Sequence, residues 1–310
     1  MSTQLFAQPS RFTIARCAAM MLLVGIAIAL QASPVFAQDG QTARPAKPLT
    51  QPPMDTSPKP WTGKFLPDGQ PDVMGGTWAN TFGGTGRLDN PYAGGNTDPN
   101  APLRPSRIID PPDGKIPYQP WADALQRAEE KHVGNPTKPE HIDTQARCLP
   151  GGIPRLNYYV GNATILQTPG FVTFLWDRFH IYRVIRLDNA PRLAPNVKLW
   201  MGDARGHWDG NTLVVETTNY SGKHRLTSQG DFMSENSKIT ERYVFLTPDR
   251  IAYEVTITDP TVYTRPWTMR VEQKRSMPKG YEAEIWEAAC WEGNMQRPGG
   301  IEGLLEANTK

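Results

Sequence analysis

Alternating apolar and polar residues along the second half of the chain predict a β domain. β-Branched and aromatic residues dominate a series of short runs after residue 156, and turn sequences such as Asp209-Gly210-Asn211 separate them. The runs cover residues 164–167, 171–176, 180–187, 212–220, 239–246, 251–257, 267–274 and 282–286. This succession predicts a mainly β fold over 156–310, an antiparallel up-and-down barrel or a strongly curved, lipocalin-like sheet.

The first half of the chain lacks this alternation and is rich in proline. Residues 38–155 contain 20 prolines, whereas 156–310 contain eight. Because proline has no N–H, long strands are not expected there. We therefore predict a disordered or extended tether over 38–60 and an irregular wrap over 61–155, with at most a short strand near 75–80.

Helical spacing occurs at two places. Pro120 suits a first helical turn, and apolar residues recur at three-to-four spacing after it, at Trp121, Ala124, Leu125 and Ala128. This pattern predicts a helix over 120–131 whose apolar face packs on the protein while the charged face points outward. A second short helix is expected near residues 300–307.

Residues 1–37 have the pattern of a secretory signal. Arg11 and Arg16 precede an uncharged apolar run over 17–30, and Val35-Phe36-Ala37 places small side chains at the −3 and −1 positions of a cleavage site. The run is short for a membrane span. We expect an exported protein without a stable membrane anchor after cleavage; an uncleaved N-terminal anchor is the alternative.

Charge and cysteine content change once this segment is removed. The whole chain has 33 basic and 31 acidic residues, and the segment holds two arginines and no acid, so the remainder is formally neutral. A neutral chain is not expected to bind nucleic acid by counterion release. Two cysteines remain, Cys148 and Cys290, which most simply form a disulfide in an oxidising compartment, with two separate buried thiols as the alternative.

Several motifs resemble an uncharacterised family of exported proteins from soil and aquatic bacteria. The motifs are PDVMGGTW (71–78), RCLPGGIPR (147–155), QTPGFV (167–172), LWMGDARGHWDGNTLVVETTNY (199–220), ITERY (239–243), YEVTITDP (253–260), TRPWTM (264–269) and EAACWEGN (287–294). The resemblance implies a periplasmic or secreted bacterial protein and no particular activity. Many relatives have His after the second cysteine, where this chain has Trp291.

Two charged residues fall on apolar faces of predicted strands. Alternation places Arg183 among Phe179, Ile181 and Ile185, and it places Glu241 among Ile239, Tyr243 and Phe245. Charges that point into a core are costly unless they are paired. One interpretation is a structural ion pair. The other is a ligand pocket in which Arg183 binds an oxygen and Glu241 acts as a base.

A second set of candidates surrounds the glycines of residues 200–209. His207 is a candidate general base oriented by Asp203, although Asp203 also suits a turn or cap, and His180 lies on the strand face opposite Arg183. Residues near Asp259-Pro260 and Arg265-Pro266 could form the rim of a barrel mouth. The candidate substrate-binding residues in addition to Arg183 are Trp200, Arg205, Tyr253, Arg265 and Trp267.

The leading functional hypothesis is an exported β-barrel protein that binds a small, partly apolar organic molecule. Cofactor-independent acid–base chemistry of the isomerase, lyase or hydratase type is the candidate reaction, with Glu241, His207, His180 and Asp203 as catalytic candidates. The alternative is a non-catalytic carrier or envelope-interaction module. Neither a metal nor a cofactor is predicted, because the His and Cys residues lack ligand spacing and no nucleotide motif is present. The sequence does not indicate an oligomeric state.

Overall fold

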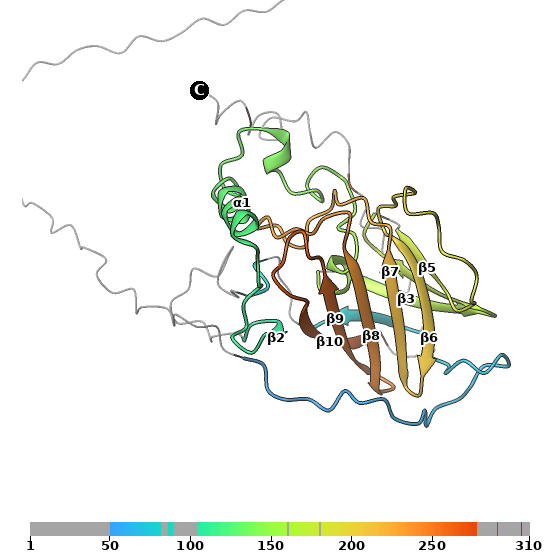
Figure 1. The fold of residues 1–310 in the computed structure, drawn as a ribbon. Coiled ribbons are helices and arrows are strands. Elements are labelled where there is room, and N and C mark those ends of the chain that lie inside the picture. Colours follow the sequence, from blue (N-terminus) through green and yellow to red (C-terminus); the bar gives the residue numbers. More distant parts are fainter. Residues whose placement is uncertain are drawn as a thin grey trace, which may run out of the picture. The chain divides into compact units, whose positions relative to one another are not determined.

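A computed structural model describes residues 50–81, 86–89, 105–159, 161–179, 181–277, 290 and 305. Its strands form one sheet that closes on itself, because β1 pairs with both β3 and β10. Nine strands thus make a barrel, and β2 adds to a free stretch of β10 (Figure 1). The predicted mainly β barrel is confirmed.

Most strands follow the alternating runs of the sequence, but the strands at 108–110 and 203–209 were not predicted. They are β1 (Thr77–Asn80), β2 (Ile108–Asp110), β3 (Asn162–Thr168), β4 (Phe171–Trp176), β5 (Tyr182–Arg186), β6 (Asp203–Asp209), β7 (Thr212–Thr218), β8 (Lys238–Thr247), β9 (Arg250–Thr258) and β10 (Trp267–Met277). The predicted hairpin at Asp209-Gly210-Asn211 is present, with Asp209 paired to Thr212. The predicted strand at 282–286 and the signal segment lie outside the described residues, and of the helix predicted near 300–307 only Leu305 is described, in a helical conformation.

One strand pair departs from the up-and-down pattern. β5 and β6 are parallel and meet at Arg186 and Arg205. A tight hairpin cannot join parallel strands, so residues 187–202 form the connection between them. The turn residues Asp188 and Asn189 follow β5 closely, but the chain continues there into this long connection and not into a hairpin.

Every second side chain along a strand points into the barrel interior. Along β8 the inward residues are Ile239, Glu241, Tyr243 and Phe245, all buried. They pair with Ile257, Val255, Tyr253 and Ile251 of β9, which are buried as well. This period of two is what a closed barrel requires of its strands.

The N-terminal segment over 50–60 is extended and hydrogen-bonded to the outside of the barrel. The Gln51 side chain donates to the Arg270 carbonyl at 2.9 Å, and Thr56 donates to Glu254 at 3.0 Å. Near the β6–β7 hairpin, the Lys59 carbonyl accepts from the Asn211 N–H at 2.7 Å. In Figure 1 this segment, which we call the strap (residues 50–60), runs in blue past the hairpin ends. The extended form of the predicted tether is thus seen here; residues 38–49 lie outside the described part.

Helix α1 (Pro120–Lys131) has the predicted bounds but buries a different face. Ala122 and Gln126 are buried, whereas Trp121 and Leu125 are 50% and 43% exposed. The predicted packing face is therefore wrong. The physical reason is a buried hydrogen bond, in which the Gln126 amide donates to the Gln229 carbonyl at 3.0 Å and turns the polar side of the helix inward. Two 3-10 turns complete the described elements, η1 (Pro139–His141) and η2 (Arg155–Asn157).

The predicted Cys148–Cys290 disulfide is present, with the Cα atoms 5.4 Å apart. It links the loop between η1 and η2 to a residue beyond β10, so both flanks of the barrel are covalently joined. Within the described ranges, no helix is long and apolar enough to cross a membrane.

Replacing Gly210 by alanine should destabilise the protein more than replacing Gly170. Both glycines have positive φ, at 57° and 77°, so both alanines are strained. A methyl group at 210 would also overlap the Lys59 carbonyl of the strap, whereas at 170 it meets no atom within 4 Å. We expect an extra loss of about 1–3 kcal/mol in urea unfolding. Equal losses would show that the strap does not press on this hairpin.

Candidate functional site

The barrel interior contains a buried ion pair between Arg183 of β5 and Glu241 of β8. The guanidinium binds both carboxylate oxygens, with Nη1–Oε1 at 3.0 Å and Nη2–Oε2 at 2.5 Å. Arg183 is 3% exposed and Glu241 is fully buried. Alternation along the two strands therefore identified the interior charges correctly, and the structural ion pair is one of the two interpretations it left open.

Neutral donors complete the shell of the Glu241 carboxylate. The hydroxyls of Tyr243 and Tyr253 both donate to Oε1 at 2.9 Å, and the Asn157 amide approaches the same atom at 3.4 Å. Burial, then the Glu241 charge, raises the pKa of both tyrosines well above the usual value, so both remain neutral donors. Tyr253 is thus a predicted site residue that the structure brings to Glu241, while Asn157 and Tyr243 were missed.

Electrostatics also favours the charged form of Arg183. Burial alone lowers the pKa of Arg183, but the Glu241 carboxylate outweighs it, and the guanidinium pKa lies above its usual range. Arg183 Nη2 makes a further hydrogen bond of 2.5 Å to the Thr217 hydroxyl. Oε1 of Glu241 accepts four hydrogen bonds and Oε2 accepts from Arg183 and Thr217, which leaves little capacity to take a proton from a ligand.

The predicted orientation of His207 by Asp203 is wrong. Asp203 begins β6 rather than a turn, and its carboxylate accepts from the Arg205 guanidinium and, at 3.0 Å, from the Leu193 N–H. His207 lies on the same strand with its side chain exposed to solvent. Asp203 and Arg205 therefore hold the β5–β6 connection: Arg205 also donates to the Pro191 carbonyl at 2.9 Å.

The remaining predicted ligand-binding residues do not meet at one point. Trp267 is fully buried in the core, and its ring packs edge-on against Tyr263 at 5.5 Å. Arg265 is exposed and pairs with Asp110 at 2.6 Å. Trp200 donates to the Pro150 carbonyl at 3.0 Å. His180 lies outside the described residues.

The motif segments 147–155 and 199–220 converge on a buried histidine. His224 Nε2 lies 2.9 Å from the Ile153 carbonyl, and its ring is 5.5 Å from that of Tyr220. Gly152, at φ 72°, lies so close that a side chain there would overlap the His224 ring. Burial lowers the pKa of His224 to about 4, so the imidazole is neutral near pH 7. Close packing at Gly152 accounts for one glycine of the CLPGGIPR motif.

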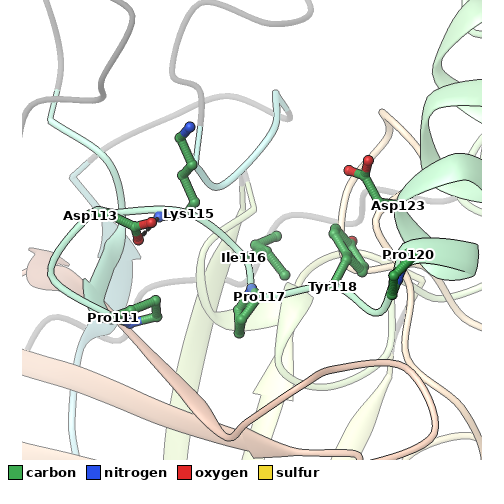
Figure 2. A pocket seen from close by; sticks show the side chains of 8 residues that line it. All are labelled: Pro111, Asp113, Lys115, Ile116, Pro117, Tyr118, Pro120 and Asp123. Atoms are coloured by element: carbon green, nitrogen blue, oxygen red, sulfur yellow. Dashed lines mark hydrogen bonds between the residues drawn. The ribbon is translucent and has the colours of Figure 1, made fainter.

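A surface hollow of about 300 Å³ lies between β2 and α1 (Figure 2). The residues that line it are Pro111, Asp113, Lys115, Ile116, Pro117, Tyr118, Pro120 and Asp123. Main-chain bonds hold this wall against the barrel: the Thr264 N–H donates to the Pro117 carbonyl and the Gln119 N–H donates to the Val262 carbonyl, each at 2.8 Å. The hollow lies in the proline-rich wrap, where strand periodicity gave no signal.

Beneath the hollow lies a buried carboxylate, Asp231. Its oxygens accept from the Tyr118 hydroxyl at 2.9 Å and from the Thr227 hydroxyl at 2.6 Å. Asp89 is also buried nearby and shares Arg87 with Asp231, at 3.0 and 4.0 Å from that guanidinium. Burial, then the Asp89 charge, raises the pKa of Asp231 to about 6. A carboxyl that titrates near neutrality beside a concave surface is typical of functional sites. Asp231 is an isolated acidic residue between Gly230 and Phe232 and belongs to no sequence motif.

Comparisons with protein-family models, curated proteins and solved structures found no match to this chain. In the described part of the chain, no group of three or more His, Cys, Asp and Glu side chains is arranged to hold a metal ion.

Neutralising Glu241 should cost far more stability than neutralising an exposed carboxylate. The Glu241→Gln substitution leaves the Arg183 charge buried without its partner, and we expect a loss of about 3–5 kcal/mol in urea unfolding. Asp188→Asn is the matched control, because its pair with Arg186 is over 40% exposed and screened by solvent, so its loss should change stability little. The Arg183→Met/Glu241→Leu double variant should recover much of the loss. Equally small losses of unfolding free energy in Glu241→Gln and Asp188→Asn would contradict this account.

His224 and Asp231 should have opposite effects on stability in acid. His224 has a folded pKa of about 4 against an ordinary 6.5, so as pH falls through this range only the unfolded chain takes up the proton, and stability decreases. Asp231 has a folded pKa of about 6 against 3.8, so the folded chain takes up the proton first, and stability increases. Each contribution is about 3 kcal/mol between pH 6.5 and 4.

The two variants separate these contributions. Between pH 6.5 and 4, the free energy of unfolding of Asp231→Asn should decrease by about 3 kcal/mol more than that of wild type. The free energy of unfolding of His224→Gln should decrease by about 3 kcal/mol less than that of wild type. Unfolding free energies at pH 7, 6, 5 and 4 measure both changes, and groups common to the three proteins cancel. Parallel curves for all three proteins would rule out the assigned proton uptake.

Proposed function

We propose that this chain is an exported β-barrel protein that binds a small, partly apolar organic molecule in the hollow between β2 and α1. The observation that carries the proposal is the hollow itself, whose volume of about 300 Å³ is at the lower end for ligand pockets. Proline rings and Ile116 provide apolar contacts, and Asp113, Lys115 and Asp123 provide charged groups at the edge. The signal pattern of residues 1–37 and the Cys148–Cys290 disulfide support export.

The binding function is favoured over acid–base catalysis at Glu241. A general base needs a free lone pair within reach of its substrate. Glu241 is fully buried and accepts hydrogen bonds from Arg183, Tyr243 and Tyr253, so its chemistry is structural in this proposal. The filled interior likewise argues for a ligand site outside the barrel rather than a lipocalin-like central cavity.

A neutral, polarity-sensitive naphthalene dye such as prodan tests the proposal. We expect its emission to shift to the blue on addition of the protein, because the dye leaves water for an apolar surface. Pro117→Arg places a charged, bulky side chain in the half-buried wall of the hollow and should weaken the dye affinity at least tenfold, by about 1.4 kcal/mol.

Leu166→Arg is the matched control, because Leu166 is 46% exposed on β3 and is not part of the hollow. It should leave the dye affinity unchanged. Urea unfolding midpoints of both variants report whether they are folded. Equal weakening by both variants, or no shift with wild type, would count against the hollow as the binding site.

A further inference from the structure

We propose that the ligand of the hollow is a small organic cation, an amine-bearing molecule with an apolar group attached. This inference rests on the proposed function, because it names the chemical class of ligand for that same site. It follows from three features: the charges beneath and around the hollow, the lining of its walls, and the connection of both to Asp231.

The carboxylates near the hollow outnumber the cations. Beneath it, Arg87 is shared by three carboxylates, those of Asp89 at 3.0 Å, Glu130 at 3.4 Å and Asp231 at 4.0 Å. Asp89 Oδ1 is buried and has no hydrogen-bond partner among the described residues. Such an unused acceptor in a buried carboxylate leaves negative potential that Arg87 does not neutralise.

The rim adds further negative charge. Asp113 and Asp123 both line the hollow, against Lys115, whose side chain extends away from Pro111 and Pro117 in Figure 2. Asp123 is paired with Arg127 at 2.8 Å, but that pair is largely exposed and screened.

The N-terminus of α1 has the opposite effect, because the positive end of its helix dipole disfavours a cation. Its dipole corresponds to about half a positive charge at Pro120 and favours anions. Asp123 already lies in that first turn and complements the dipole. Among the described residues named here, five carboxylates face three cationic side chains, so the net charge near the hollow still favours a cation. The carboxylates are those of Asp89, Asp113, Asp123, Glu130 and Asp231, and the cations are Arg87, Lys115 and Arg127.

The walls suit the apolar part of such a ligand. The rings of Pro111, Pro117 and Pro120 and the side chain of Ile116 line the hollow together with the Tyr118 ring. An aromatic ring attracts a cation over its face, with about 0.5–1 kcal/mol at exposed sites. The Tyr118 hydroxyl is held by Asp231, so the ring cannot turn away from the wall without breaking that bond.

The same bond couples the hollow to protonation. Burial, and then Asp231, keep the pKa of Tyr118 well above its usual value, so the tyrosine stays neutral and Asp231 is the group that titrates near neutral pH. The charged groups facing Asp231 are Arg87 and Asp89, with Glu130 beyond Arg87. Loss of the Asp231 proton as pH rises past about 6 adds one negative charge under the hollow, which should strengthen cation binding.

Three probes of similar shape test the ligand class: 2-phenylethylammonium, 2-phenylethanol and 3-phenylpropanoate. Isothermal titration of the full chain at pH 7 and low salt should give at least tenfold tighter binding of the cation than of the alcohol, and the weakest binding for the carboxylate. The preference should shrink at 0.5 M salt, because the rim charges are screened.

Variants locate the charges that cause the preference. Asp113→Asn/Asp123→Asn should weaken the cation at least threefold and leave the alcohol unchanged, whereas Asp188→Asn, the same change at an exposed pair on another part of the barrel, should alter neither. In wild type the cation preference should grow from pH 5 to 7, and in Asp231→Asn it should stay constant.

The outcomes separate this inference from the proposed function. Equal binding of cation and alcohol, or tighter binding of the carboxylate, would overturn the cation class while a binding hollow remains. If none of the three probes binds and the naphthalene dye shows no shift, both proposals fail. A cation preference that survives in the Asp113→Asn/Asp123→Asn variant and does not change with pH would place the cation elsewhere and overturn the inference.

Discussion

The Arg183–Glu241 ion pair is the constraint on which the barrel depends. β5 and β8 are separated in the sheet by β6 and β7, so three strand spacings of about 4.8 Å would place these residues roughly 14 Å apart on a flat sheet. Direct contact at 2.5 Å between the ends of the two side chains fits the curvature of the closed sheet. A one-residue slip of either strand would turn its charge outward and leave the other buried and unpaired. The pair therefore favours this register of the strands.

The ion pair also determines what the interior can do. Two tyrosines, an amide and a threonine contribute hydrogen bonds to it, buried apolar residues surround it, and Arg183 Nε is buried without a partner among the described residues. Polar groups held in such a buried cluster favour one arrangement of the strands. The proposed binding site therefore lies in a segment outside the barrel. The proline-rich wrap provides such a segment over residues 111–123.

Local periodicity was sufficient for the barrel and its ion pair, and it failed where distant segments decide the outcome. The period of two placed Arg183 and Glu241 on interior faces before any contact between them was known. The helix 120–131 was found by its spacing, but a bond from Gln126 to Gln229 reversed its buried face. The Asp203–His207 pairing failed because Arg205 and the Leu193 N–H occupy the carboxylate. The hollow is lined by residues 111–123 alone, but its wall is held by Asp231, Val262 and Thr264 from the second half of the chain, and no local pattern predicts those contacts.

The high proline content of the wrap takes on a physical role in this arrangement. Residues without N–H groups cannot extend the sheet, and within its described residues the wrap adds only the short strands β1 and β2. Main-chain bonds anchor it to the barrel near the hollow, from Pro117 to Thr264 and from Gln119 to Val262. Around these anchors the rings of Pro111, Pro117 and Pro120 form an apolar wall, and Tyr118 is hydrogen-bonded to Asp231. A wall restrained by proline rings would lose little conformational entropy on ligand binding, which supports the proposal that a shallow hollow binds a small molecule.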